Sequence, residues 1–213
     1  MRNPRIAWIL TVVSVIVSVV AYPFLPELVP SHWNVQGEID GMMGRLPTVL
    51  LLPAIIVVMV VLRDWLPKLD PRRENYAEFQ GTYQLIINAL VLFLLVLHVA
   101  ILAVGLGVKV DVSTFVQVGI GLLLMVIGNE LSRVQPNYFV GIRTPWTLTD
   151  PENWRRTHRM GGRVMVISGA AIALAGVLLP SFFAFVVTML SVLAMVGGTI
   201  GYSYYVWRQA HAR

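Results

Sequence analysis

Long uncharged runs, separated by short polar segments, dominate the hydrophobic pattern of this chain. They cover 6–26, 46–62, 79–108, 112–129 and 164–207. A helix that crosses a bilayer needs about 20 mostly apolar residues, so each of the first four runs predicts one span. The last run is about twice as long as one crossing requires, and Pro180-Ser181 near its middle predicts a turn between two spans. We therefore predict an all-α membrane protein, a bundle of six transmembrane helices at about 6–25, 46–64, 84–106, 112–129, 163–179 and 182–206.

Composition supports a membrane protein. The chain is 57% hydrophobic and 13% charged, whereas soluble domains carry about 25% charged residues. We expect one integral membrane domain over 1–213, with an N-terminal part at 1–64 that holds an outer loop at 26–45. A second part at 84–213 holds an inner loop at 130–162. The first apolar run is long for a signal peptide and lacks a small-residue cleavage site, so we expect it to be retained as a helix.

The distribution of positive charge predicts the orientation. Of the 16 Lys and Arg residues, all but Arg45 and Lys109 fall on the side that holds both termini. By the positive-inside rule, both termini face the cytoplasm. The net charge of +5 then indicates contact with anionic lipids rather than direct binding of nucleic acid. The absence of cysteine excludes disulfides and thiolate chemistry.

The inner loop is the polar segment richest in candidate residues. A short cytoplasmic interfacial helix is expected near 150–160, capped either by Thr149 with Glu152 or by Asp150 with Pro151. Gly161-Gly162 would end it. Trp154 and His158, four residues apart, would share one face, and Trp154 would anchor the helix in the membrane interface while arginines reach phosphates. The candidates for partner binding or for a structural role are Asn129, Asn137, Phe139, Gly141, Arg143, Thr144, Pro145, Trp146, Trp154, His158 and Arg159.

Arg143 admits two interpretations. Gly141 permits a tight turn and Pro145 fixes the chain beyond it, so the loop could aim the guanidinium at a phosphate, a carboxylate or a set of carbonyls. Alternatively, Arg143 ties the loop to the helix ends, for example through Glu130.

The outer loop carries a second candidate set: Pro30, His32, Trp33, Asn34, Gly37 and Asp40. It is either a compact, turn-rich loop anchored by Trp33 or a recognition surface for an external ligand. His32, Glu38 and Asp40 match no established metal-ligand spacing, so we predict no metal and no cofactor. Carboxylates outnumber cations on the outer side, which weakly favours a cationic ligand.

Two features inside the spans have ordinary explanations. His98 and Asn88 of the third span should form interhelical hydrogen bonds, with a proton path as the alternative. Gly197-x-x-x-Gly201 of the sixth should pack inside the bundle, with a dimer contact as the alternative.

Catalytic signatures are missing from the sequence. Glu130, Arg143 and His158 form the one plausible acid–base set, and no hydrolase, metalloprotease or phosphate-loop motif is present. We therefore predict a protein that is not an enzyme, with a small transporter or a lipid-processing membrane enzyme as the alternative.

Two long motifs resemble a known family. Pro136-Asn137-Tyr138-Phe139-Val140-Gly141-Ile142-Arg143-Thr144-Pro145-Trp146, followed by 154–162, closely resembles the bacterial Sdp immunity family. Pro30-x-His32-Trp33-Asn34-x-x-Gly37-x-x-Asp40-Gly41 looks like the short domain of unknown function that precedes it in many members.

The resemblance implies a function and a set of partners. It implies a six-span membrane protein that protects the cell from a secreted peptide toxin, the sporulation-delaying peptide in the founding system. In that system the protein also holds a cytoplasmic repressor at the membrane when toxin is present. The implied partners are thus membrane lipids, a secreted peptide toxin and a cytoplasmic repressor.

Overall fold

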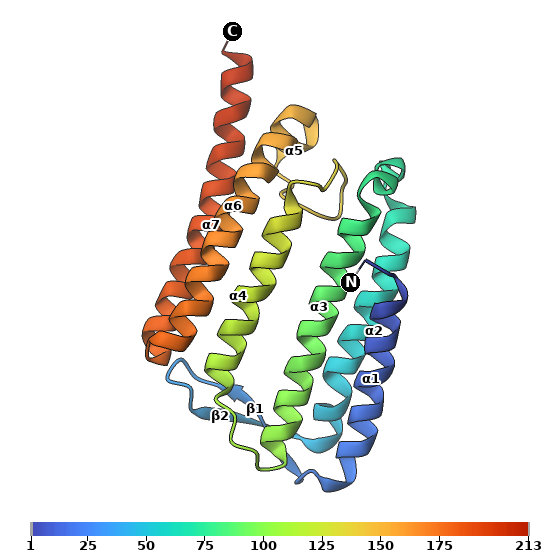
Figure 1. Cartoon of the computed structure of the whole chain (residues 1–213), viewed down its shortest axis with the longest axis vertical. Helices are drawn as coiled ribbons and strands as arrows, with labels where there is room; N and C mark the ends of the chain where they lie inside the picture. The colour runs from blue at the N-terminus through green and yellow to red at the C-terminus, as the bar shows by residue number, and fades with distance from the viewer. Residues whose placement is uncertain (1, 213) are drawn as a thin grey trace.

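Six long helices run alongside one another in the computed structural model, which describes residues 2–212 (Figure 1). All six are long and apolar enough to cross a membrane, which confirms the predicted six spans, and both termini lie towards the same end of the bundle. We call this end the inner end and the opposite end the outer end, following the predicted orientation. The long helices are α1 (Arg5–Ala21), α2 (Arg45–Leu69), α3 (Tyr76–Gly105), α4 (Val112–Leu131), α6 (Pro151–Leu178) and α7 (Ser181–His211).

The helices form two groups of three. Helices α1, α2 and α3 pack together, and α4, α6 and α7 form the second group, with α3 and α4 adjacent between them (Figure 1). Apolar side chains such as Ala7, Ile56 and Val91 fill the core of the first group. Short elements connect the helices: η1 (Tyr22–Phe24), β1 (Leu28–Trp33), β2 (Ile39–Gly44), η2 (Arg73–Asn75) and α5 (Pro145–Thr149).

Paired glycines bring α4 and α6 into close contact. A Cβ added to Gly121 would lie 2.5 Å from the carbonyl oxygen of Gly169, and one added to Gly128 would lie 2.7 Å from that of Gly162. The two glycines of each helix are seven residues apart and therefore lie on one face. Small residues at such positions let membrane helices approach backbone to backbone. We call this contact the glycine seam.

The inner loop differs from its prediction. Residues 150–160 do not form a separate interfacial helix, because α6 runs without interruption from Pro151 to Leu178. Gly161 and Gly162 are buried inside it, where Gly162 packs on Gly128. Close packing thus outweighs the low helix propensity of glycine. Asp150 caps α6 by accepting the N–H of Glu152 at 2.8 Å, so the second of the two predicted caps is confirmed.

The expected internal packing of Gly197 and Gly201 is wrong. Both glycines are exposed on α7, and among the described residues no atom lies within 4 Å of a Cβ built at either position.

The buried polar groups of α3 form the expected interhelical hydrogen bonds. His98 Nε2 lies 2.8 Å from Ser18 Oγ of α1, and the Ser18 hydroxyl donates to the carbonyl of Val49 in α2 at 2.7 Å. Asn88 Nδ2 donates to the carbonyl of Asn3, just before α1, at 3.0 Å. These bonds satisfy polar groups that would be costly in hydrocarbon.

The outer loop is a β-hairpin rather than a turn-rich loop without strands. Strands β1 and β2 pair antiparallel from Leu28 opposite Gly44 to Trp33 opposite Ile39, with an irregularity around His32. Val29 is fully buried in a cluster with Val49 and Leu102, which anchors the hairpin to the first helix group. Figure 1 shows the hairpin lying across the outer end of the bundle towards α4 and α7.

Candidate functional site

The tip of the hairpin is shaped by Asn34 and Gly37. Asn34 Oδ1 accepts the backbone N–H groups of Gln36 at 3.0 Å and Glu38 at 2.9 Å. Gly37 has φ +87°, a conformation that a side chain strains. A Cβ here would also lie 3.0 Å from Ser113 Oγ and 3.2 Å from Ser181 Oγ. The tip therefore rests on the first turns of α4 and α7, and the hairpin bridges both helix groups.

His32 and Asp40 form an exposed pair across the hairpin. His32 Nδ1 lies 2.5 Å from Asp40 Oδ1, and the side chains keep 71% and 43% of their accessible surface. Gly41 lies opposite His32 in the register. Glu38, the third residue considered for a metal, contacts Asn34 Nδ2 at 3.1 Å instead. The structure thus brings His32 and Asp40 together and leaves Glu38 with a different partner.

A groove of about 660 Å³ lies between the hairpin and the outer ends of α4 and α7. The hairpin contributes mostly polar residues, and the helices contribute both polar side chains and apolar ones such as Ile120 and Phe185. Gln117 of α4 also lines the groove, and its Oε1 is a buried acceptor without a donor among residues 2–212. We call this cavity the outer groove. From the hairpin it is lined by Ser31, His32, Trp33, Asn34, Val35 and Asp40.

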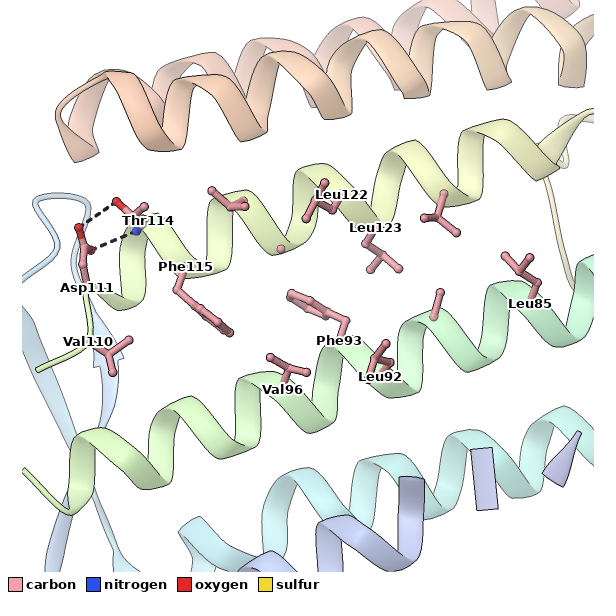
Figure 2. A pocket seen from close by; sticks show the side chains of 14 residues that line it. Leu85, Leu92, Phe93, Val96, Val110, Asp111, Thr114, Phe115, Leu122 and Leu123 are labelled. Atoms are coloured by element: carbon pink, nitrogen blue, oxygen red, sulfur yellow. Dashed lines mark hydrogen bonds between the residues drawn. The ribbon is translucent and has the colours of Figure 1, made fainter. Parts of the chain in front are cut away.

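A second groove, of about 780 Å³, separates the two helix groups along α3 and α4. Figure 2 shows its apolar walls, with Phe93 of α3 and Phe115 of α4 projecting into the space between the helices. Gly119 makes room for the Phe93 ring, because a Cβ there would lie 2.7 Å from it. At the outer end, Asp111 caps α4 by accepting the N–H of Thr114 at 3.1 Å. The two groups therefore contact each other less closely than α4 contacts α6.

Asn137 organises the inner loop that follows α4. It is fully buried; its Nδ2 donates to the carbonyls of Gln135 and Val140, and its Oδ1 accepts the N–H groups of Phe139 and Val140. These bonds fold residues 135–140 around one side chain. Gly141 follows with φ +116°, and a Cβ there would collide with the ring of His158. The loop thus requires an amide at one position and glycine at the other.

His158 and Trp154 support this loop from α6. His158 is 0% exposed; its Nδ1 lies 2.8 Å from the Trp154 carbonyl, and its Nε2 accepts the Ile142 N–H at 2.9 Å. The Trp154 ring stacks on His158 with 4.0 Å between centroids, and Trp154 Nε1 donates to the Val134 carbonyl at 2.7 Å. The two residues share a face as predicted. They are buried, however, so the expected membrane anchoring by Trp154 is wrong.

The segment after Gly141 combines a buried cap with exposed side chains. Thr144 and Thr147 form a capping box at the start of α5, with Pro145 at the first helical position. Trp146 packs against Tyr204 of α7 with 5.2 Å between centroids. Arg143 is exposed and donates to the Tyr138 carbonyl at 2.6 Å. The predicted tie through Glu130 is therefore wrong, because Arg143 closes its own loop.

Several structural residues were missed by sequence reasoning. Asp70, at the end of α2, is buried and accepts from the Tyr76 hydroxyl at 3.1 Å and from the Tyr138 N–H at 2.9 Å. It fastens the inner loop to the first helix group. Asn153 fastens the same region to α7 through the Ser203 carbonyl at 2.8 Å. The sequence signal for Asp70 was its position, since it is a charged residue directly before Pro71 at the end of an apolar helix.

The remaining inner-loop candidates lie apart from this core. Asn129 and Arg159 are exposed on α4 and α6, and Phe139 is partly buried. Glu130 is buried and held by Thr82 at 2.7 Å, Arg133 at 2.8 Å and Arg2 at 3.3 Å. The predicted candidates thus divide between the outer groove, the buried inner core and an exposed surface on α4 and α6.

Together, these features define the class: a multi-pass membrane protein of six helices, with an outer hairpin and a structured inner loop. Residues 133–204 match the SdpI/YfhL protein family, and residues 9–57 match a domain of unknown function, DUF1648. The second half of the chain is thus similar to the SdpI/YfhL family. The two matches cover most of the inner loop and the whole hairpin, the segments that carry the candidate residues.

Two relatives come from Bacillus subtilis (strain 168). The immunity protein SdpI is 26% identical over 206 residues, which are 96% of this chain and 97% of that protein. The uncharacterized membrane protein YbgB is 34% identical over 56 residues, 26% of this chain and 62% of that protein. No solved structure matches the chain.

Proposed function

We propose that this protein gives its cell immunity to a secreted peptide toxin. The observation that carries the proposal is the similarity to the immunity protein SdpI over 96% of the chain. The six membrane spans, three in each helix group, and the outer groove at the outer end of the bundle are compatible with this role.

Toxin recognition is assigned to the outer groove. A peptide that attacks a membrane is amphipathic and lies with its apolar face in the bilayer interface. The groove offers apolar walls at Ile120 and Phe185 beside polar atoms of the hairpin. Asp40 adds an exposed carboxylate to the lining, which would attract a cationic peptide.

The hairpin offers a route from recognition to the rest of the molecule. Val29 anchors it in the first helix group, while Gly37 rests on Ser113 and Ser181 of the second. A peptide that moves the hairpin would bias how the two groups meet at α3 and α4. Such coupling requires two arrangements of the groups with different affinity for the peptide.

A relay to a cytoplasmic regulator is the further part of this proposal. Its docking surface would be formed by the exposed Arg143 and Pro145 and the partly buried Trp146, because the remaining motif residues are mostly buried. Arg143 bonds a carbonyl of its own loop and forms no ion pair among the described residues, so it can still bind a carboxylate.

The lipid-enzyme alternative receives no support from the geometry. Both ring nitrogens of His158 contact the backbone, and Glu130 is bound by Arg2, Arg133 and Thr82. Arg143 bonds elsewhere. These three residues have separate partners and do not assemble one acid–base site.

Survival of a toxin-sensitive strain that lacks its own immunity protein tests the proposal. The strain would express this protein and face the sporulation-delaying peptide, and we expect protection. Val116→Trp, which fills the outer groove, should abolish it, whereas Leu193→Trp on the exposed face of α7 should not. Membrane levels must match. Absence of protection by the parent protein would contradict immunity to this toxin. Full protection by Val116→Trp would contradict toxin recognition in the outer groove.

A further inference from the structure

A third groove, of about 500 Å³, lies at the inner end of the glycine seam. Its floor is Gly128 of α4 and Gly162 of α6, whose backbones are in close contact. Because neither residue has a side chain, the surface is hollowed where the helices meet. Asn129 and Ser132 line the α4 side, and Arg159 and Arg163 line the α6 side.

The two arginines give this groove a strong positive charge. Arg159 and Arg163 are four residues apart and exposed, and within the part of the chain that the structure describes neither forms a hydrogen bond or an ion pair. The carboxylates nearby in sequence have other partners. Glu130 binds Arg2 and Arg133, and Glu152 binds Arg155. The two guanidinium groups therefore remain available for an anion.

The polarity of the groove changes along the helices. Towards the outer end, its lining becomes apolar with Val166 and Ile167, and Ile167 is 70% exposed. These residues begin the uncharged run 164–207, so the arginines lie where the apolar part of α6 starts. A ligand that fits must carry an anionic group next to an apolar chain.

We propose that this groove binds the phosphate of an anionic membrane lipid. Arg159 and Arg163 would bind the phosphate oxygens, since guanidinium groups match phosphate geometry. The Asn129 amide and the Ser132 hydroxyl can donate to the headgroup. One acyl chain lies along Val166 and Ile167. The lipid would bridge α4 and α6 at the inner end of the glycine seam, and this role does not depend on immunity.

Lipid retention in native mass spectrometry tests the site. The full-length protein would be purified from nanodiscs that contain equal amounts of phosphatidylglycerol and phosphatidylcholine with the same acyl chains. We expect selective retention of phosphatidylglycerol. Arg159→Gln with Arg163→Gln should lower this selectivity about 25-fold, because each cation near an anionic lipid contributes about fivefold.

Two further variants separate the groove from bulk charge. Ser132→Phe fills the groove but keeps both arginines, and it should lower the selectivity as well. Arg73→Gln with Arg208→Gln removes the same charge from exposed inner residues elsewhere and should leave the selectivity unchanged.

Three results would overturn the proposal. The first is unchanged selectivity in both groove variants, and the second is an equal loss in the control pair. The third is complete displacement of the lipid by inorganic phosphate at low millimolar concentration, because it would identify a site for the free ion. Melting temperatures of all variants, measured in detergent, identify any that are unfolded.

Discussion

The inner loop and the outer hairpin are built from the same residue types, yet they use them differently. Each contains a histidine, a tryptophan, an asparagine and a glycine with positive φ. In the inner loop, His158 is 0% exposed and both ring nitrogens contact the backbone. In the hairpin, the His32 side chain is 71% exposed and contacts one carboxylate beside the outer groove. A dense polar motif in a membrane protein can therefore stabilise the fold at one end and form a candidate binding surface at the other.

The largest effect is expected when the histidines are replaced one at a time, which tests this contrast. His158→Ala removes a stacked, buried ring and leaves the Ile142 N–H without its acceptor, which should destabilise the protein by about 4 kcal/mol. His32→Ala should change stability by less than about 0.5 kcal/mol, because its side chain is exposed. Melting temperatures of both variants in detergent measure the difference. Equal shifts in melting temperature would contradict a structural role for the inner loop.

A comparison of Gly141 with Gly107, two of the three described glycines with positive φ, tests the role of packing in the inner loop. Gly141→Ala strains the backbone and drives a methyl group into His158, at a cost of about 3 kcal/mol. The melting temperature should fall by roughly 6–12 °C. Gly107→Ala is the matched control, with φ +88° but no atom within 4 Å of the added Cβ among described residues. It should cost about 1 kcal/mol. Similar losses of stability in the two variants would show that backbone strain alone, and not the contact with His158, destabilises Gly141→Ala.

The glycine seam beneath the inner loop provides a third test. Gly121→Ala forces a methyl group against the Gly169 carbonyl and should cost about 2 kcal/mol. Gly197→Ala lies on the exposed face of α7 and should be neutral or slightly stabilising, because alanine favours helix by up to about 1 kcal/mol. Thermal unfolding in matched detergent compares them. A larger loss for Gly197→Ala would indicate that this face packs against another molecule.

The smallest effect is expected at the rim of the outer groove. Asp40→Asn removes one exposed carboxylate and should weaken binding of a cationic peptide about threefold to fivefold at low salt, with a smaller change at high salt. Titration of the sporulation-delaying peptide onto the protein in nanodiscs at two ionic strengths measures this. Glu74→Gln, at an exposed position of the inner end, serves as the charge control. A salt-independent effect would argue against a charge contact at Asp40.

The sequence predicted the membrane architecture because bilayer thickness constrains every span in the same way. Uncharged runs gave six helices, and Pro180 marked the turn between α6 and α7. Local sequence signals were misleading where contacts between helices determine the structure. Gly161-Gly162 usually indicates a helix end, but here both lie inside α6 at the glycine seam. Gly197 and Gly201 have the spacing of a packing motif but face outward.

The two candidate regions could be located but not interpreted from the sequence. Pro30 and the glycines of β2 gave little strand signal, so the hairpin was missed, although the tip residues Asn34 and Gly37 were singled out. In the inner loop the important residues were found, but their burial depends on contacts with distant groups. Asp70 reaches Tyr138 across the two helix groups, and no spacing rule relates them.

The most direct test of the account is whether the peptide contacts the outer groove. A benzophenone amino acid would replace Phe185 in the groove or, as the control, Leu193 on the exposed face of α7. The protein in nanodiscs would be irradiated with labelled sporulation-delaying peptide. We predict crosslinking at position 185 that excess unlabelled peptide suppresses, and little at position 193. Equal crosslinking at both positions, or none at 185, would contradict recognition in the outer groove.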